Sequence, residues 1–266
     1  MKKGRLTKIE QTRRLKLLLE FIFIFRYAAR YQLFEFSRTI IGLTHPRWLV
    51  DYACKRGLIH SYFAPIFKVN IKKGKDLINE QEALIKHYRF EKRHAGVNSF
   101  QKHNLLVNMY LTLNRYVDVR LMNWESEWIL RIGRHKWESI PDSVFILPYG
   151  TKIAIELELQ HKRLDFLKRK VSVYRYDIEK VRYHAVFIIA SDHKYYEGLK
   201  KRLSKVAPFF CQKAFIFAYP DMLEQGLCFY NNEVMGLKEL GYLLKLQNTD
   251  VVVKMSEIKN NPEVKS

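Results

Sequence analysis

The chain has 266 residues, 48% of them hydrophobic, and a formal net charge of +20 at pH 7. This apolar content excludes global disorder and allows two domains of ordinary size. The charge predicts a polyanionic partner, with nucleic acid as the first candidate and an acidic membrane surface as the second. Residues 1–105 hold 22 Lys and Arg against 8 Asp and Glu, so we expect the DNA-binding domain in this part.

The cysteines and the apolar stretches bear on the compartment. Cys54, Cys211 and Cys228 are isolated in the sequence, which argues against a zinc site or a disulfide framework and favours a reducing environment. Leu15–Phe25 has the apolar character of a signal-peptide core, but charged residues interrupt it and it is too short to cross a bilayer. We therefore expect a cytoplasmic protein without a membrane partner.

The first part of the chain predicts three helices and a hairpin. They are expected at residues 9–26, 30–37, 44–56 and 58–71. Thr44 is the predicted N-cap of the third helix, Pro46 suits its first turn, and Gly57 suits the position after its end. This order is typical of a winged helix-turn-helix, in which the third helix enters the major groove of DNA.

Four basic residues of this domain are predicted to bind nucleic acid. Arg47 and Lys55 project outward from the third helix by helical phase, together with Val50, whereas Lys72 and Lys73 follow the hairpin. The alternative is a structural three-helix unit with a solvated basic face. The concentration of positive charge in this domain favours DNA binding.

We expect the first domain to cover residues 1–98, the second 99–250, and a polar tail 251–266. In the second domain, helices are expected at 101–114, 161–180 and 195–205, with strands within 117–131, in a hairpin over 140–160, and at 182–191 and 214–218. This order predicts a mixed α/β domain with at least one parallel crossover.

The hairpin at 140–160, turning at Pro148, Tyr149 and Gly150, carries acidic residues on both strands. Apolar and polar residues alternate along its second strand, so Glu156 and Glu158 share one face, about 6–7 Å apart. Folding the hairpin brings Asp142 to the same level. Three converging carboxylates repel one another unless protons or a cation neutralise them, and Mg²⁺ or Mn²⁺ accepts oxygen ligands.

Such a cluster suits the cleavage of phosphodiesters. Asp142 and Glu156 are the predicted metal ligands, and Glu158 is a further ligand or a general base. Lys162 is predicted to contact the scissile phosphate, and Glu127 to complete a second metal site. The alternatives are a turn for Pro-Asp, a solvated strand face for Glu-x-Glu, and a surface position for Glu127.

The basic residues of the helix at 161–180 extend the predicted DNA surface into the second domain. Arg163 and Arg175 lie on its outer faces and are expected to bind nucleic acid.

Pro141-Asp142 and Glu156-Leu157-Glu158 resemble the signature of the PD-(D/E)xK nuclease superfamily, with Glu158 in place of the usual lysine. Lys162 is the candidate for a migrated lysine. The chain is also similar to the replication-relaxation family and the related MobC-type plasmid relaxases. The motifs that carry this second likeness are His103-Asn104, Pro141-Asp142, Ile155–Glu158, Lys162 and Arg175-Tyr176.

The resemblance implies an α+β protein, with a winged helix followed by a restriction-endonuclease-like domain. It implies a metal-dependent nickase acting on double-stranded DNA at a plasmid or mobile-element origin, with mobilisation, replication or transposition proteins as further partners. Tyr174 or Tyr176 could act as a covalent nucleophile, although a structural role is favoured for both.

Two other functions stay open at this point. The first is a non-catalytic replication initiator or repressor with a degenerate nuclease fold, which Glu158 in place of lysine and Asn104 in place of an acid favour. The second is a transposon end-cleaving endonuclease with the same nuclease core.

Overall fold

The computed structural model describes residues 7–63, 66–78, 84, 88, 97–117, 123–132, 140–147, 150–206 and 215–244. The expected turn residues Pro148 and Tyr149, Cys211 and the tail at 251–266 lie outside these ranges. The chain forms two compact units, Met1–Leu111 and Thr112–Ser266. Their boundary lies inside helix α6 (Val97–Val117), whereas we expected it after residue 98.

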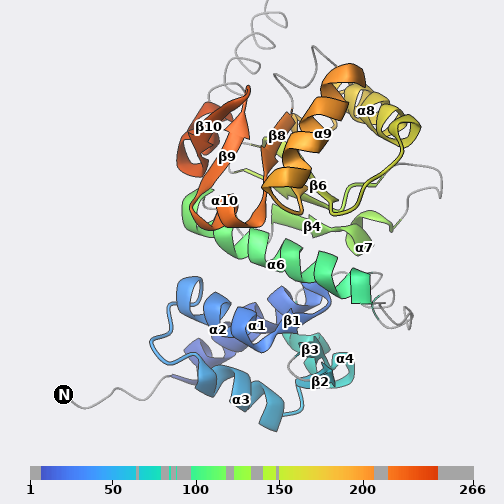
Figure 1. Ribbon diagram of the computed structural model, residues 1–266. Coiled ribbons are helices and arrows are strands. Elements are labelled where there is room, and N and C mark those ends of the chain that lie inside the picture. The colour runs from blue at the N-terminus through green and yellow to red at the C-terminus, as the bar shows by residue number, and fades with distance from the viewer. Residues whose placement is uncertain are drawn as a thin grey trace, which may run out of the picture. The chain divides into compact units, whose positions relative to one another are not determined.

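The first unit combines helices with a small antiparallel sheet (Figure 1). Its elements before α6 are α1 (Lys8–Phe25), β1 (Ala28–Ala29), α2 (Arg30–Thr39), α3 (Arg47–Lys55), β2 (Ile59–Phe63), β3 (Ile66–Val69), α4 (Ile71–Gly74) and the 3₁₀ turn η1 (Lys75–Leu77). The strand order is β1-β3-β2, and both pairs are antiparallel. The three expected helices and the hairpin are therefore confirmed.

Aromatic packing holds the first unit together. The rings of Phe21 and Phe36 stack with their centroids 4.1 Å apart, which joins α1 to α2. Phe25 packs on Tyr110 of α6 at 5.4 Å, so the part of α6 that belongs to this unit covers α1. Such ring pairs contribute about 0.5–1.5 kcal/mol beyond the burial of their area.

Helix α3 differs in detail from the prediction. It begins at Arg47 with Pro46 as N-cap, so Thr44 lies outside the helix and the predicted Thr44 cap is wrong. Val50 is buried rather than outward-facing, because it lies beside Leu49 on the core side. Gly57 has φ +65°, which confirms its place after the helix end, where glycine adopts a left-handed conformation without steric cost.

The second unit is built on a seven-stranded mixed sheet with the order β10-β9-β8-β7-β6-β5-β4. Besides the end of α6, its elements are β4 (Trp124–Ser126), α7 (Glu127–Leu130), β5 (Ser143–Ile146), β6 (Lys152–Glu158), α8 (Leu164–Glu179), β7 (Ala185–Ala190), α9 (His193–Val206), β8 (Phe215–Ala218), α10 (Pro220–Glu224), β9 (Leu227–Tyr230), β10 (Glu233–Gly236) and a helix at 237–244. The pairs β6–β7 and β7–β8 are parallel, which confirms the predicted crossovers, and the other pairs are antiparallel.

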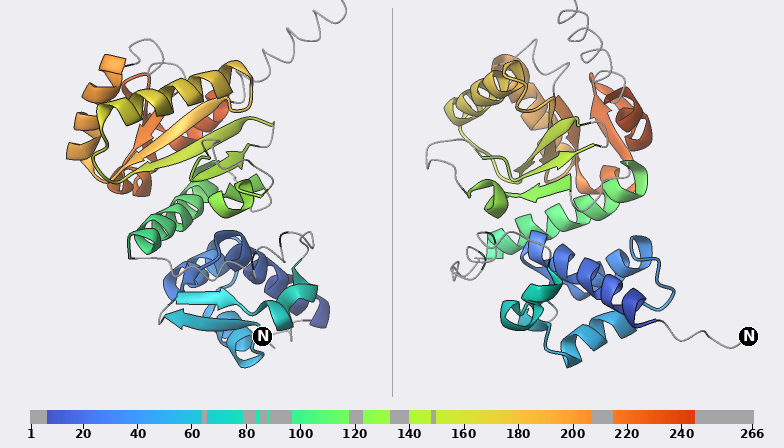
Figure 2. Two further views of the ribbon diagram at one scale, coloured as in Figure 1. Left: turned by 90° about the vertical axis from the view of Figure 1, so that its right-hand side faces the viewer. Right: turned by 180° about the vertical axis from the view of Figure 1, so that it is seen from behind.

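Helices α8 and α9 cover one face of this sheet (Figure 2). Leu167, Val171 and Tyr174 of α8 belong to the same buried cluster as Ala154 of β6 and Ile188 of β7. Strand β6 is buried from Ile153 to Glu158, so both of its faces are covered. Glu156 and Glu158 therefore do not lie on a solvated face, and that alternative is wrong.

Among the described residues, no helix combines the length and the apolar character that crossing a bilayer requires.

A buried carboxylate–lysine network as the candidate active site

The first strand pair of the site brings Asp142 beside Glu156. Ser143 is opposite Ile155 in the β5–β6 ladder, and the Asp142 N–H donates to the Ile155 carbonyl at 3.0 Å. The Leu157 N–H donates to Asp142 Oδ2 at 2.8 Å, so the Asp142 side chain replaces a backbone acceptor where the ladder ends. Asp142 therefore lies at the level of Glu156, and its side chain contacts the Leu157 backbone, which separates the two glutamates.

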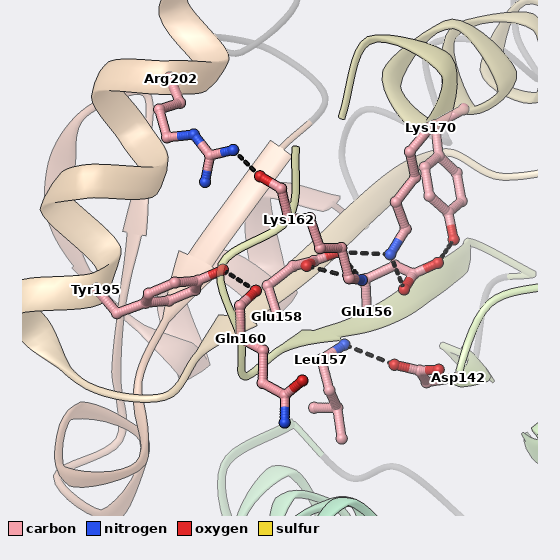
Figure 3. A network of polar contacts seen from close by, with 10 residues as sticks. Asp142, Glu156, Leu157, Glu158, Gln160, Lys162, Lys170, Tyr195 and Arg202 are labelled. Carbon is pink, nitrogen blue, oxygen red and sulfur yellow. Dashed lines mark hydrogen bonds and ion pairs between the residues drawn. The ribbon is translucent and has the colours of Figure 1, made fainter. Parts of the chain in front are cut away.

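A lysine from α8 bridges the two glutamates (Figure 3). Lys170 Nζ lies 2.5 Å from an oxygen of Glu156 and 2.5 Å from an oxygen of Glu158. The Tyr174 hydroxyl donates to the second oxygen of Glu156. Glu156 and Glu158 are only 4% and 2% exposed, and the Lys170 side chain 15%, so this ion network is shielded from water.

Lys162 reaches the same network from the loop before α8. Its ammonium lies 3.0 and 2.9 Å from the two oxygens of Glu158. We expected Lys162 in the first helical turn, but α8 begins at Leu164, and Arg163, its N-cap, is extended. The loop is held from α9, because Arg202 donates to the Lys162 carbonyl and the Tyr195 hydroxyl donates to the Gln160 carbonyl at 2.5 Å.

Burial controls the protonation of the network. It raises the pKa of Glu156 to about 7; the Lys170 ammonium opposes this shift, and the Asp142 carboxylate adds to it. Burial alone would lower the pKa of Lys170, but the two glutamates together raise it above its ordinary value. Lys170 is therefore charged at neutral pH, where Glu156 exchanges its proton.

Tyr174 and Tyr176, the two candidate nucleophiles, have different surroundings. Burial and the Glu156 charge raise the pKa of Tyr174 well above its ordinary value, so its hydroxyl stays protonated and acts as a donor. A buried neutral phenol is a weak nucleophile. Tyr176 lies on the outside of α8 and is half-exposed.

A small cavity of about 20 Å³ adjoins the network between the sheet and the two helices. Glu156, Glu158 and Lys170 line one side of it, and apolar residues such as Leu199 and Phe215 line the other. A volume of this size holds about one water molecule. The accessible lining of the cavity is almost entirely apolar, so it offers such a water few polar partners.

Glu127 is placed differently from its prediction. It begins the short helix α7 rather than lying in a strand, and its side chain pairs with Arg131 one helical turn later. Its N–H donates to the Asp142 carbonyl at 3.1 Å, so its backbone adjoins the site. Its role at a second metal ion stays a prediction.

The predicted DNA-binding residues lie on the surfaces of both units. All six are exposed, namely Arg47, Lys55, Lys72, Lys73, Arg163 and Arg175. Arg47 pairs with Asp51 at 3.4 Å, Arg163 with Asp165 at 3.3 Å and Arg175 with Glu179 at 2.8 Å. Solvent-exposed pairs of this kind contribute little to stability, which leaves these side chains available to phosphates at small cost.

His103 and Asn104, the remaining motif, belong to the first unit. The His103 ring contacts Tyr27 edge-on at 5.3 Å, and Asn104 accepts a hydrogen bond from Gln32 Nε2 at 2.8 Å. Both contacts are internal to that unit and join α6 to its neighbours.

The donor set of the network suits a hard divalent cation. It consists of carboxylate oxygens, and the two glutamates are matched in number by the ammonium groups of Lys162 and Lys170. The position between the glutamates already accommodates a positive charge, namely the Lys170 ammonium. In the described part of the chain, no three His, Cys, Asp or Glu side chains are gathered as a metal site, since the glutamates face Lys170. A cation at Glu156 would therefore compete with Lys170.

Lys170 is the residue that sequence reasoning missed. A signal for it exists, because Lys170 lies in the buried stripe formed by Leu167, Val171 and Tyr174 at helical spacing. A lysine in such a stripe requires a buried anion.

Comparison with known proteins adds no assignment. No family model matches the chain, and no curated protein matches it. Among solved structures, protein VC1899 from Vibrio cholerae is similar at 10% identity with a TM-score of 0.30, over 91% of this chain and 58% of that one. A likeness at this level carries no argument about fold or function.

Proposed function

We propose that the chain is a DNA-binding, metal-dependent endonuclease that nicks DNA. The observation that carries the proposal is the buried pair Glu156 and Glu158 around Lys170, with Asp142 bonded to the backbone between the two glutamates from the adjacent strand. This set resembles the PD-(D/E)xK pattern, and Lys170 of α8 would take the place of the lysine that the pattern has on the strand. Lys170 is a stronger candidate for the migrated lysine than Lys162, because it contacts both glutamates.

Asp142, Glu156 and Glu158 would hold Mg²⁺ or Mn²⁺. Such an ion supplies an activated water and stabilises charge on the phosphate. Lys170, which is charged at neutral pH, orients both glutamates and offers a positive charge to the phosphate. Because burial raises the pKa of Glu156 to about 7, an ion held there would compete with a proton near neutral pH.

The first unit supports DNA binding. Its order of helix, strand, two helices and two strands supports the proposal of a winged helix, in which α3 would enter the major groove. Arg47 and Lys55 on α3, with Lys72 and Lys73 beyond β3, offer positive charges to phosphates. The choice of plasmid or mobile-element origins as substrates follows from the family resemblance alone.

The test is nicking of supercoiled plasmid DNA by the full chain with Mn²⁺ or Mg²⁺. Asp142→Asn keeps an oxygen for the Leu157 N–H but removes the charge, so it should reduce nicking at least about a hundredfold while the fold persists. Lys170→Met should do the same, whereas Lys168→Met, an exposed lysine of the same helix, should nick normally. Wild-type nicking by Asp142→Asn would refute the proposal.

The near-complete burial of Glu156 and Glu158 favours a second candidate, a non-catalytic DNA-binding protein. In that function the network would stabilise the fold. Calorimetry distinguishes the two candidates, since the nuclease takes up Mn²⁺ in a manner that Glu156→Gln abolishes. The non-catalytic protein binds duplex DNA but shows no such uptake.

A further inference from the structure

Helix α8 and the residues directly after it have an unusual density of exposed apolar side chains. Among the described residues, eight large hydrophobic side chains are exposed, and four of them lie between residues 164 and 181. They are Leu164, Phe166, Tyr176 and Val181. Phe166 and Tyr176 are each 49% exposed, although an aromatic ring gains more by burial than most side chains.

Each of the two rings has at least one cation over it. Lys162 Nζ lies 5.1 Å from the centroid of Phe166. Lys180 and Arg182 lie 5.9 and 5.7 Å from the centroid of Tyr176. An aromatic face beside a cation is suited to stack a nucleobase while the cation meets the adjoining phosphate.

These side chains follow one line along the helix. Phe166, Arg169, Tyr176 and Lys180, which we call the outer stripe, fall on one face by their three- and four-residue steps through Val173. The stripe extends about 21 Å from Phe166 to Lys180 at 1.5 Å per residue. Aromatic and cationic groups alternate along the stripe. A surface that binds a protein or a lipid would instead be continuously apolar.

The inner side of the same helix carries Lys170 and Tyr174 to the carboxylates. Lys162 connects the two sides, because its ammonium touches Glu158 and also lies over the ring of Phe166. A strand lying along the outer stripe would therefore end at the candidate site.

We infer that the outer stripe binds an unpaired DNA strand, stacking bases on Phe166 and Tyr176. Unpaired bases are required, because stacking between neighbouring base pairs in a duplex hides the base faces and leaves only phosphates for the cations. The chemistry that recognises the strand is stacking combined with charge, without base-specific hydrogen bonds. This inference rests on the proposed function and makes a single-stranded segment part of the substrate.

The experiment measures anisotropy of a fluorescein-labelled 20-nucleotide dT strand with the full chain in EDTA. The double variant Phe166→Ala/Tyr176→Ala should weaken binding at least about fivefold for each ring, from the measured range for base–aromatic stacking. Phe166→Trp/Tyr176→Trp keeps both stacking faces and should bind normally. Tyr242→Ala, which removes a 61% exposed tyrosine elsewhere in the same unit, is the matched control.

Binding of a duplex of the same length should change less than twofold in the double variant. Equal losses for both DNAs, or no loss for the single strand, would overturn the inference. So would unchanged strand binding together with lost binding to phosphatidylserine vesicles, since the stripe would then be a membrane contact. Because EDTA removes divalent ions, these outcomes do not depend on cleavage, whereas normal nicking by Asp142→Asn refutes the nuclease proposal separately.

Discussion

Replacing Lys170 by Met tests the network most directly. The substitution keeps the length of the side chain but removes the ammonium that lies 2.5 Å from both Glu156 and Glu158. Two adjacent buried carboxylates then lose their shared counter-charge. Breaking a buried pair in this way typically costs about 3–5 kcal/mol of the free energy of unfolding.

The loss should depend on pH. At pH 8 the glutamates of Lys170→Met must ionise beside each other or remain protonated at a cost, so the full destabilisation is expected. At pH 5 Glu156, whose pKa burial raises, binds a proton, so the repulsion weakens and the difference from wild type should shrink. Thermal denaturation should show a decrease of the melting temperature of about 6–20 °C at pH 8, from roughly 2–4 °C per kcal/mol in a domain of this size.

Lys168→Met is the matched control for this measurement. Lys168 lies on the exposed side of α8, so its substitution should change the free energy of unfolding by less than about 0.5 kcal/mol. If Lys170→Met changes the free energy of unfolding at pH 8 by no more than Lys168→Met does, the ammonium does not join the glutamates, and the proposed role of Lys170 in the site is refuted. If Lys170 competes with a metal, Mn²⁺ should also stabilise Lys170→Met more than wild type.

Three further predictions concern neighbouring groups. Burial raises the folded pKa of Glu156 from 4.5 to about 7, so the free energy of unfolding of the wild type should fall by up to about 3 kcal/mol as the pH rises through this interval. Urea denaturation of Glu156→Gln should show no such dependence on pH. Tyr174→Phe removes a donor to Glu156 and should cost about 1–3 kcal/mol in the same assay. Arg47→Ala/Lys55→Ala should weaken duplex binding and reduce its salt dependence by about one ion per residue, and a steeper slope in salt titrations would contradict phosphate contact.

The shared face of the two glutamates could be predicted from the sequence, because it depends on local rules. A strand period of two puts Glu156 and Glu158 on one face, and an antiparallel hairpin brings Asp142 to their level. The burial of these residues could not be predicted in this way. It depends on α8 and α9 covering that face, a tertiary arrangement that the acidic alternation of β6 does not indicate.

The start of α8 and the role of Lys170 show a similar limit. Helical propensity favours a start at His161, but hydrogen bonds from Tyr195 and Arg202 hold residues 160–162 outside the helix. These partners are 35 and 40 residues away in sequence. The helix phase of Lys170 was available, yet lysines on a basic helix are normally assigned to solvent.

The position of α8 has a thermodynamic consequence. One continuous helix carries Lys170 inward to the acids and the outer stripe outward. If uptake of a cation displaces Lys170 and shifts α8, the affinity of the outer stripe for a DNA strand would change as well. By linkage, the strand would then change the affinity for the cation by the same factor as the cation changes the affinity for the strand.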